Sequence, residues 1–272
     1  MPHDHEYGFH GASLINREVA GFTFREIVHP AGVSVSKHSH ENAHMGVILR
    51  GGFEERCEGR TLDCRPMSVS YLAPGMSHSD EFHTSVHCFV IEISAKKWAS
   101  LATEIPLTQP AFQARGPLAW LTMKLYGEMR FAGDTSASAL IVEGLAIEVL
   151  NGLEGAKTAL SNNDRPAWLG GALEMINDRF SDPLTHAEIA REARVHPVHL
   201  ATAFRRYVGC TIGEYIRRLR MERACRQLST TNMPLVDIAL DAGFCDQSHF
   251  SKTFKRFVGL SPNSFRNTLR SA

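Results

Sequence analysis

The stretch His249–Arg266 reads HFSKTFKRFVGLSPNSFR, and its pattern already occurs fifty positions earlier in the chain. There, His199–Arg217 reads HLATAFRRYVGCTIGEYIR, so that His, Phe, Arg, Val and Gly recur at one constant offset. The pairs Ile189–Ala190 and Ile238–Ala239 precede the two copies at matching places. Each copy therefore predicts a helix, a turn and a second helix. Two such helix-turn-helix units predict a chain that contacts two adjacent segments of double-stranded DNA.

Charge is distributed unevenly along the 272 residues, although Lys plus Arg and Asp plus Glu number 29 each. From Arg165 onward there are 16 basic and 10 acidic residues, against 13 basic and 19 acidic residues before it. This asymmetry assigns the contact with nucleic acid to the C-terminal half. The length predicts two domains, which we place at residues 1–160 and 166–272.

The sequence lacks the signals of membrane and secreted proteins. No apolar run approaches the length that crosses a bilayer, and the start MPHDHEYGFHG has no apolar core of a secretory signal. The six cysteines are scattered without a CxxC spacing, as expected for reduced thiols. We therefore expect a cytoplasmic protein without membrane contact.

The N-terminal half contains short β-like runs followed by helical spacing. Phe22–Ser94 includes runs such as FTFREIVH and SVHCFVIEIS, separated by glycine and proline turns, which predict a small sandwich or barrel. Ala95–Glu104, Gly116–Phe131 and Thr135–Leu153 show helical spacing. These helices would cover the barrel or pair with a second subunit, so we expect a homodimer. The polar stretch Gly155–Arg165 is the best linker candidate.

The C-terminal half predicts helices throughout, so the expected fold class is α+β. Thr185 and Thr211 each precede a glutamate by three residues, which is the pattern of a capping box at a helix start. Pro197 opens the first recognition helix, and Asp246 is placed to cap the second.

Each predicted recognition helix has an apolar face for the core and an opposite face for DNA. The N-terminal part of such a helix reaches base edges, and side chains farther along are better placed for phosphates. The candidate base readers are Val198, Ala201 and Thr202 in the first copy and Gln247, Ser248, Ser251 and Lys252 in the second. The candidate phosphate contacts are Arg205, Arg206, Lys255 and Arg256. The side chains of the first copy favour contact with thymine methyl groups or shape readout. Those of the second copy are polar and can form hydrogen bonds with base edges.

A different interpretation, solvated surface charge, is open for any single basic residue, but repetition of the whole unit argues against it for the set. Residues Trp168–Arg270 resemble the DNA-binding domain of the AraC family of transcription regulators. The motif that carries the resemblance runs from Ile238 to Arg266 and reads IAxxAGFxDxSxFxxxFKxxxGxSPxxFR. It implies two helix-turn-helix units joined by a rigid helix, here Ile212–Leu228, that enter successive major-groove segments. The first reading helix departs from the family in having few polar readers.

The same resemblance implies an N-terminal domain that senses a ligand, mediates dimerisation, or does both. By family analogy alone, activation through contact with RNA polymerase is favoured over repression.

Histidines in the N-terminal half follow a second informative spacing. His38 and His40 alternate, His44 follows closely, and His78 comes after the turn Pro74–Gly75. Because alternate residues of a strand point to one face, His38 and His40 are expected to share a face. Imidazole donors suit Zn, Ni, Fe or Cu far better than Mg or Ca.

This spacing resembles the two motifs of the cupin superfamily, small double-sheet barrels with a metal inside. The family's first motif has Glu where this chain has His44, and its second has one residue between the proline and the glycine that precede the histidine. Carried over by position, the metal ligands would be His38, His40, His44 and His78. Each ligating ring would need a hydrogen-bond partner, for which Glu41, Asp80, Glu81 and His83 are nearby in sequence. Alternatively, the barrel holds an organic ligand or nothing, and the histidines line a polar pocket.

Three functions are compatible with these features. The first is a transcription regulator controlled by a metal ion or small molecule in the cupin-like domain. The second is a metal-dependent cupin enzyme, such as a dioxygenase or isomerase, fused to a DNA-binding domain. The third is a DNA-binding module whose N-terminal domain serves dimerisation only. The chain offers metal ligands but no evident acid–base or nucleophile motif, so we favour regulation and expect no enzymatic activity.

Overall fold

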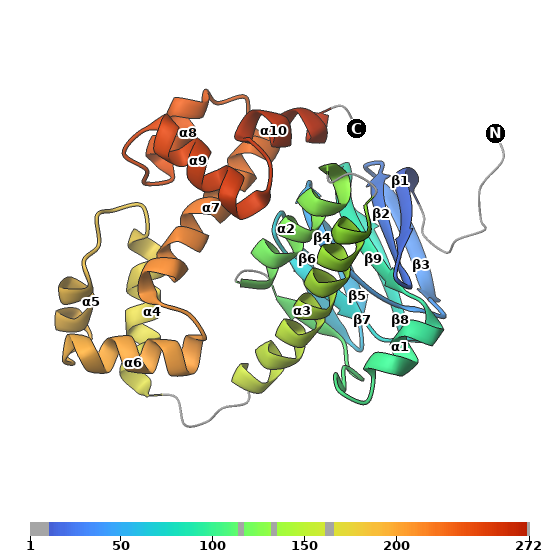
Figure 1. Ribbon diagram of the computed structural model, residues 1–272, viewed down its shortest axis with the longest axis horizontal. Coiled ribbons are helices and arrows are strands. Elements are labelled where there is room, and N and C mark those ends of the chain that lie inside the picture. The colour runs from blue at the N-terminus through green and yellow to red at the C-terminus, as the bar shows by residue number, and fades with distance from the viewer. Residues whose placement is uncertain (1–10, 114–116, 132–134, 161–165, 271–272) are drawn as a thin grey trace.

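A β-sandwich with flanking helices forms the N-terminal half of the protein, and the C-terminal half is helical (Figure 1). The computed structural model describes residues 11–113, 117–131, 135–160 and 166–270. The predicted α+β class is confirmed. The histidine-rich start of the chain and residues 161–165 of the predicted linker lie outside the described residues.

The sandwich consists of two antiparallel sheets. The larger sheet contains, in spatial order, β1 (Ala12–Val19), β2 (Phe22–His29), β9 (Val86–Ile93), β4 (Ala43–Arg50), β7 (Val69–Leu72) and β10 (Ala111–Gln113). The smaller sheet contains β3 (Val33–Ser39), β8 (Ser77–Phe82), β5 (Phe53–Cys57) and β6 (Arg60–Cys64). The edge strands β1 and β10 lie outside the predicted β region. β1 is largely exposed and β10 is short, so neither has a buried apolar alternation.

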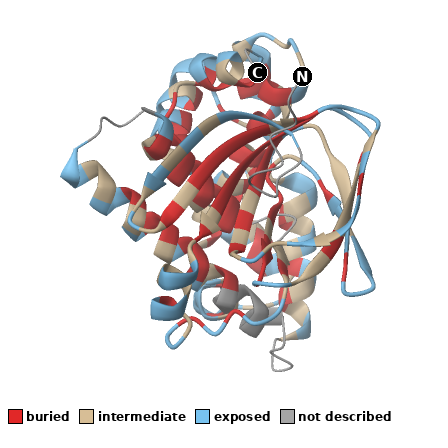
Figure 2. Ribbon diagram, turned by 90° about the vertical axis from the view of Figure 1, so that its right-hand side faces the viewer, coloured by how far each residue is buried: buried red, intermediate tan, exposed pale blue. Residues whose placement is uncertain are grey.

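The larger sheet separates two cores because alternate residues of its strands face opposite sides. On β2, Phe22 and Phe24 belong to a core shared with helices, whereas Ile27 belongs to the core between the sheets. The outer core is covered by α2 (Pro117–Phe131) and α3 (Ser136–Leu160). Figure 2 shows buried residues concentrated along the strands of this sheet. The short helix α1 (Ala95–Leu101) follows β9.

Helix α3 differs from the sequence prediction in two ways. It extends to Leu160, so residues 155–160 are helical rather than part of a linker. Its segment Ser136–Leu153 is also long and apolar enough to cross a membrane, with a mean hydropathy of 1.4, contrary to our expectation from the sequence. One such helix is weak evidence for a span, because core helices pass the same test. Here Val149 and Leu150 are fully buried in the core under the larger sheet.

Seven helices make up the described C-terminal part. They are α4 (Ala167–Arg179), α5 (His186–Glu192), α6 (Pro197–Val208), α7 (Ile212–Thr230), α8 (Leu235–Asp241), α9 (Gln247–Val258) and α10 (Pro262–Arg270). Both predicted capping boxes are present, with reciprocal bonds between Thr185 and Glu188 and between Thr211 and Glu214. The Asp246 carboxylate accepts from the His249 backbone N–H at the start of α9. Local sequence therefore fixes where these helices begin.

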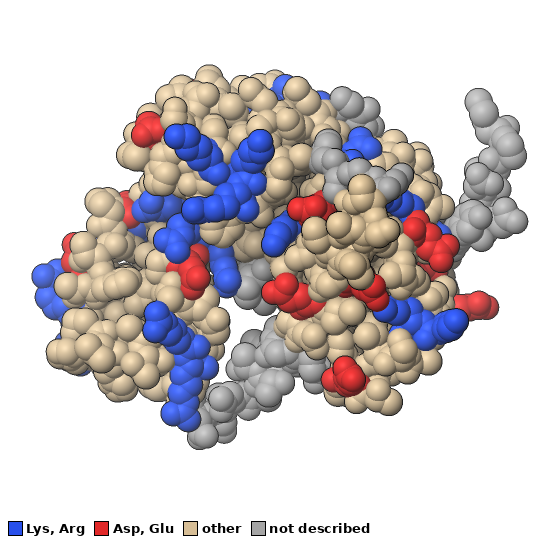
Figure 3. Space-filling model, in the orientation of Figure 1, with Lys and Arg blue, Asp and Glu red and all other residues tan. Residues whose placement is uncertain are grey.

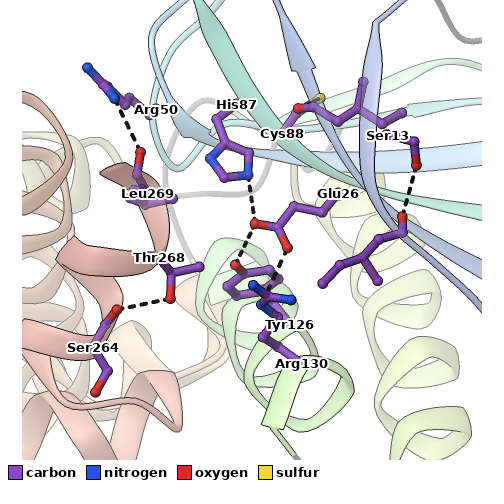
Figure 4. A network of polar contacts seen from close by, with 12 residues as sticks. Ser13, Glu26, Arg50, His87, Cys88, Tyr126, Arg130, Ser264, Thr268 and Leu269 are labelled. Atoms are coloured by element: carbon purple, nitrogen blue, oxygen red, sulfur yellow. Dashed lines mark hydrogen bonds and ion pairs between the residues drawn. The ribbon is translucent and has the colours of Figure 1, made fainter. Parts of the chain in front are cut away.

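The second helix-turn-helix unit packs directly against the N-terminal half. The rings of Trp120 on α2 and Phe257 on α9 meet edge to face, with centroids 6.3 Å apart. A Cβ atom at Gly127 of α2 would lie only 2.6 Å from the Val258 carbonyl oxygen, so glycine permits this close approach. Arg50 Nη1 donates to the Leu269 carbonyl oxygen of α10 at 3.2 Å (Figure 4). The buried residues of this unit thus join the core of the N-terminal half.

The first unit has a separate core. Its buried side chains come from α4, α5, α6 and the start of α7. Leu200 and Phe204 of α6 are fully buried in it, as the spacing predicted.

Candidate DNA-binding surface and histidine cavity

The predicted DNA contacts lie on the solvent-facing sides of α6 and α9. Phe250 and Phe254 of α9 are fully buried, so the opposite face of the helix is left for solvent. The exposed candidates are Val198, Thr202, Arg205, Arg206, Gln247, Ser248, Lys252, Lys255 and Arg256, whereas Ala201 and Ser251 are partly buried. In α6 the exposed apolar side chain is Val198, which is 66% exposed. The contrast between an apolar and a polar reading face, expected from the sequence, is therefore present at the surface.

The two recognition helices begin differently but end in the same way. α6 starts with Pro197 at its first turn, whereas α9 starts after the capping residue Asp246. They end at Gly209 and Gly259, whose φ angles of 75° and 81° are left-handed. Glycine adopts this conformation without the steric cost that a Cβ atom adds. The repeated glycine of the sequence is therefore a helix stop in each unit.

Arg220 of α7 links the two units, and sequence reasoning missed it. Its Nε donates to the Phe180 carbonyl oxygen at 2.8 Å, and its Nη2 donates to that of Asp182 at 2.9 Å. Its Nη1 donates to the carbonyl oxygen of Gly243, in the turn of the second unit, at 2.5 Å. One guanidinium thus ties the segment before α5 to the turn between α8 and α9, which limits their relative motion. Nothing in the local sequence distinguishes Arg220 from its basic neighbours.

Basic side chains gather on the C-terminal helices. In the face shown in Figure 3 they cluster over the C-terminal lobe, and acidic side chains are more frequent over the N-terminal half. A basic surface attracts the phosphate backbone of nucleic acids at long range.

The four predicted metal ligands converge inside the sandwich. His38 lies on β3 directly opposite His78 on β8, and their ring centroids are 4.2 Å apart. His40 follows β3, and its ring lies 4.5 Å from that of His44 on β4. One ring nitrogen from each of His38, His40 and His78 lies within 4.8 Å of the others. His44 reaches the same cluster, with its ring 5.7 Å from that of His78.

Burial keeps two of these rings neutral. It lowers the pKa of His44 well below its usual value, with His40 as the next cause. Burial also lowers the pKa of His78 to about 4, and the neighbouring His38 adds to the effect. Neutral imidazole is the form that coordinates a metal ion. These two rings are therefore in the ionisation state that a metal ligand requires.

The histidines line one part of a cavity of about 80 Å³ between the sheets. Two buried carboxyl groups line it as well, Glu55 on β5 and Asp80 on β8, and these residues are cross-strand neighbours. Burial, with Asp80 as a second cause, raises the pKa of Glu55 to about 8. Burial raises the pKa of Asp80 to about 7. The sequence analysis missed Glu55, although its alternation with Phe53 and Cys57 is a signal that it faces inward.

Four hydrogen-bond partners of the histidines were predicted, and only Asp80 lines the cavity. Glu41 and His83 are exposed and are not part of the lining. Asp80 Oδ2 lies 3.8 Å from His78 Nε2, so Asp80 is on the cluster side of its strand. Glu81 points the other way, and its carboxylate pairs with Arg56 at 3.1 Å. The alternation of strand residues excludes Glu81 from the cavity.

A second polar cluster lies on the other face of the larger sheet, under α2 (Figure 4). Glu26 of β2 is 1% exposed, and its Oε1 lies 2.7 Å from His87 Nε2 on β9. The Tyr126 hydroxyl donates to the same oxygen at 3.0 Å, and Arg130 Nε lies 3.6 Å from Oε2. This cluster fixes α2 to the sheet, and α2 is the helix that contacts the second unit.

Comparison with known proteins agrees with this architecture. The model of an AraC-like ligand binding domain matches residues 23–150, and that of a helix-turn-helix domain matches residues 189–268. The HTH-type transcriptional activator AarP of Providencia stuartii is 39% identical over 94 residues, covering 35% of this chain and 70% of AarP. The chain belongs to the AraC family of transcription regulators.

The similarity to AraC-family proteins extends over most of the chain. The arabinose operon regulatory protein of Salmonella typhimurium is 28% identical over 240 residues, which cover 82% of each protein. A solved structure of ToxT from Vibrio cholerae aligns with 90% of this chain and 98% of its own, at 14% identity and a TM-score of 0.40. This AraC-family protein is thus a DNA-binding transcription regulator with a ligand-binding N-terminal domain.

Proposed function

We propose that the ligand-binding domain of this regulator holds a divalent transition metal ion, Zn, Ni, Fe or Cu. The ligands would be His38, His40, His44 and His78. The observation that carries this proposal is the convergence of ring nitrogens from His38, His40 and His78 within 4.8 Å of one another. His44 lies beside them, and burial lowers the pKa of both His44 and His78. Four imidazoles form a donor set for borderline metals, which bind nitrogen ligands at about 2.0–2.1 Å in the case of zinc.

Elemental analysis of protein purified without a histidine tag tests the metal proposal. We expect about one transition metal ion per chain, and its loss from a variant with both His38→Ala and His78→Ala. His186→Ala is the matched control, because His186 is exposed on α5, does not line the cavity and lies in neither cluster of potential metal ligands among the described residues. Undiminished metal content in the double variant would show that this ligand set is wrong. DNA retardation by the same variant reports whether the fold survives.

We also propose that the metal or a small molecule acts as an effector and that the domain does not catalyse a reaction. The matched relatives are named as transcription regulators, which favours this interpretation over a dioxygenase or isomerase. A path from the cavity to DNA is available through the larger sheet. β2 and β9 carry the Glu26 and His87 contact that holds α2, and α2 contacts α9. A ligand that shifts the sheet would thereby shift the second unit.

On DNA, we propose that α6 and α9 lie in successive major-groove segments. The four basic side chains Arg205, Arg206, Lys255 and Arg256 would contact phosphates. Each phosphate neutralised contributes about −0.9 to the slope of log affinity against log salt. Removing Arg205 and Arg206 together should therefore reduce the magnitude of that slope by about two, measured by retardation of a promoter fragment. A flat salt response of the wild-type protein would contradict phosphate binding by this surface.

We propose that the protein works in the cytoplasm as a homodimer that contacts RNA polymerase. The dimer would form through α3, where Leu140 is 70% exposed and Ile141 is 48% exposed. Apolar side chains this exposed on one helix favour a protein partner. Leu140→Lys should convert the dimer to a monomer in analytical ultracentrifugation, whereas a monomeric wild-type protein would refute the proposal.

A further inference from the structure

A row of inward-facing side chains runs along the smaller sheet from the histidine cluster to the far part of the cavity. On β8, His78, Asp80 and Phe82 line the cavity in succession, because alternate residues of a strand share a face. Across the strand pair, Glu55 lies opposite Asp80. The lining therefore changes along the row from imidazole to carboxylate to aromatic ring. The histidines account for only the first of these three zones.

The carboxylate zone lacks a donor. Glu55 is 4% exposed, and its Oε1 makes no hydrogen bond among the described residues. Asp80 Oδ1 is likewise buried without a partner in the described part of the chain, and its other oxygen is 3.8 Å from His78. No Lys or Arg among the described residues pairs with either carboxylate. A buried oxygen without a donor costs free energy, which a ligand supplying N–H groups would recover.

The aromatic zone adjoins these carboxylates. The ring of Phe82 stacks on that of Phe53, with centroids 4.8 Å apart, and on that of His29, with centroids 4.2 Å apart. All three rings line the cavity. The faces of aromatic rings attract cations and pack against short carbon chains. Paired carboxylates beside aromatic rings are the surroundings that stabilise an organic cation.

We infer that the cavity binds a small organic cation carrying a primary ammonium or guanidinium group. Its N–H groups would donate to Glu55 and Asp80, and its carbon atoms would lie against Phe53 and Phe82. The cavity of about 80 Å³ restricts the ligand to a short chain. The role of this cation as an effector rests on the proposed function, but its binding does not. The competing assignment is that the carboxylates only balance the charge of a metal ion at the histidines.

Isothermal titration calorimetry on the full-length protein, both as purified and after EDTA treatment, tests this inference. The probes are n-propylamine and n-propanol, which have similar size but differ in charge. They are compared at pH 9, where Glu55 and Asp80 are ionised and the amine is still protonated. We expect the amine to bind at least about tenfold more tightly, a difference of about 1.4 kcal/mol. Glu55→Gln and Asp80→Asn should each reduce this preference to less than about threefold, because an amide supplies no negative charge.

Glu54→Gln is the matched control. Glu54 is the adjacent residue of β5, is not part of the cavity lining, and lies 3.5 Å from Arg56. This variant should keep the full preference for the amine. Circular dichroism verifies that each variant is folded. If Glu55→Gln does not fold, nuclear Overhauser effects between propylamine and the Phe53 and Phe82 rings of the wild-type protein replace it.

Three results would overturn the inference. The first is equal affinity for amine and alcohol in the wild-type protein. The second is a preference for the amine that remains in both Glu55→Gln and Asp80→Asn. Where the Overhauser measurement replaces these variants, the corresponding result is the absence of contacts between propylamine and the two phenylalanine rings. The third is loss of metal from Glu55→Gln without any amine binding by the wild-type protein, which would assign the carboxylates to the metal. DNA retardation and metal content, measured on the same samples, show whether the proposed function fails as well.

Discussion

The two helix-turn-helix units share a sequence pattern but differ in what holds them in place. The first unit has its own core, built around Phe204 and closed by α4. The second unit, built around Phe254, shares a core with the N-terminal half and contacts α2 through Phe257 and Val258. Similar helices can therefore belong to different cooperative units. Among the described residues, the contacts of α2 with α9 and of Arg50 with α10 give a signal from the ligand-binding domain a direct route to the second unit.

The largest expected effect comes from removing the central ring of each unit. Phe204→Ala and Phe254→Ala should each cost about 3–5 kcal/mol, because both rings are fully buried. Hydrogen exchange should show protection lost only in α4–α7 for the first variant. For the second variant, the loss should extend to α2 and the larger sheet. If hydrogen exchange in α2 is the same in Phe254→Ala as in the wild-type protein, the shared core is not one cooperative unit.

The next effect concerns the closest contact between the halves. In Gly127→Ala the new methyl group would clash with the Val258 carbonyl oxygen, so α9 must move away from α2. Such overpacking costs about 1–3 kcal/mol, measurable by thermal unfolding. Gly144→Ala on α3 is the control, since nothing lies within 4 Å of its added Cβ atom. The control should be neutral or stabilising by up to about 1 kcal/mol through helix propensity. Equal melting curves for both variants would contradict a tight interface.

The two reading faces should differ in how they discriminate bases. Lys252→Ala in the second unit should lose about 1–3 kcal/mol of preference for the target over a mutated site. Thr202→Ala in the first unit should lose less, because the Thr202 hydroxyl already donates to the Val198 carbonyl oxygen at 2.9 Å. Competition retardation assays with single-base changes measure both losses. A larger loss for Thr202→Ala would reverse the assignment of readout to the second unit.

The smallest effect concerns the contact between β4 and α10. Arg50→Met removes the hydrogen bond to the Leu269 carbonyl oxygen and keeps the carbon chain, at a cost of about 1 kcal/mol. Arg60→Met is the control, because Arg60 is an exposed residue on the edge strand β6. Chemical denaturation should leave that control within about 0.5 kcal/mol of the wild-type protein. Equal stability of the two variants would show that the Arg50 contact contributes nothing measurable.

Several parts of the fold could be predicted because their causes are local. The capping boxes at Thr185 and Thr211, the Asp246 cap and the faces of the recognition helices depend on residues within one or two turns. The edge strand β1 could not be predicted in the same way. It is mostly exposed and exists because it pairs with β2. Residues 155–160 begin the stretch that predicts a linker, but they continue the helix α3 that the apolar residues before them begin.

The candidate site was predictable only in part. The spacing of His38, His40, His44 and His78 assigned these residues to one cluster, and the structure brings their rings together. Glu55 escaped prediction because it enters the cavity through pairing of β5 with β8. Most glutamates on short strands are exposed to solvent, so the residue type alone does not predict a buried one. The alternation of Glu55 with Phe53 and Cys57 indicates an inward face, and the strand register adds that it lies beside Asp80.

The amino-acid sequence by itself determined the duplicated DNA-binding units, their helix boundaries and the identity of the clustered histidines. Periodicity, capping and motif spacing act over short distances along the chain, so they can be read without coordinates. The tertiary structure alone decided that carboxylates join the histidines and that the second unit docks on the ligand-binding domain. Both features depend on contacts between residues far apart in sequence, such as Gly127 with Val258, and these form only when the chain folds.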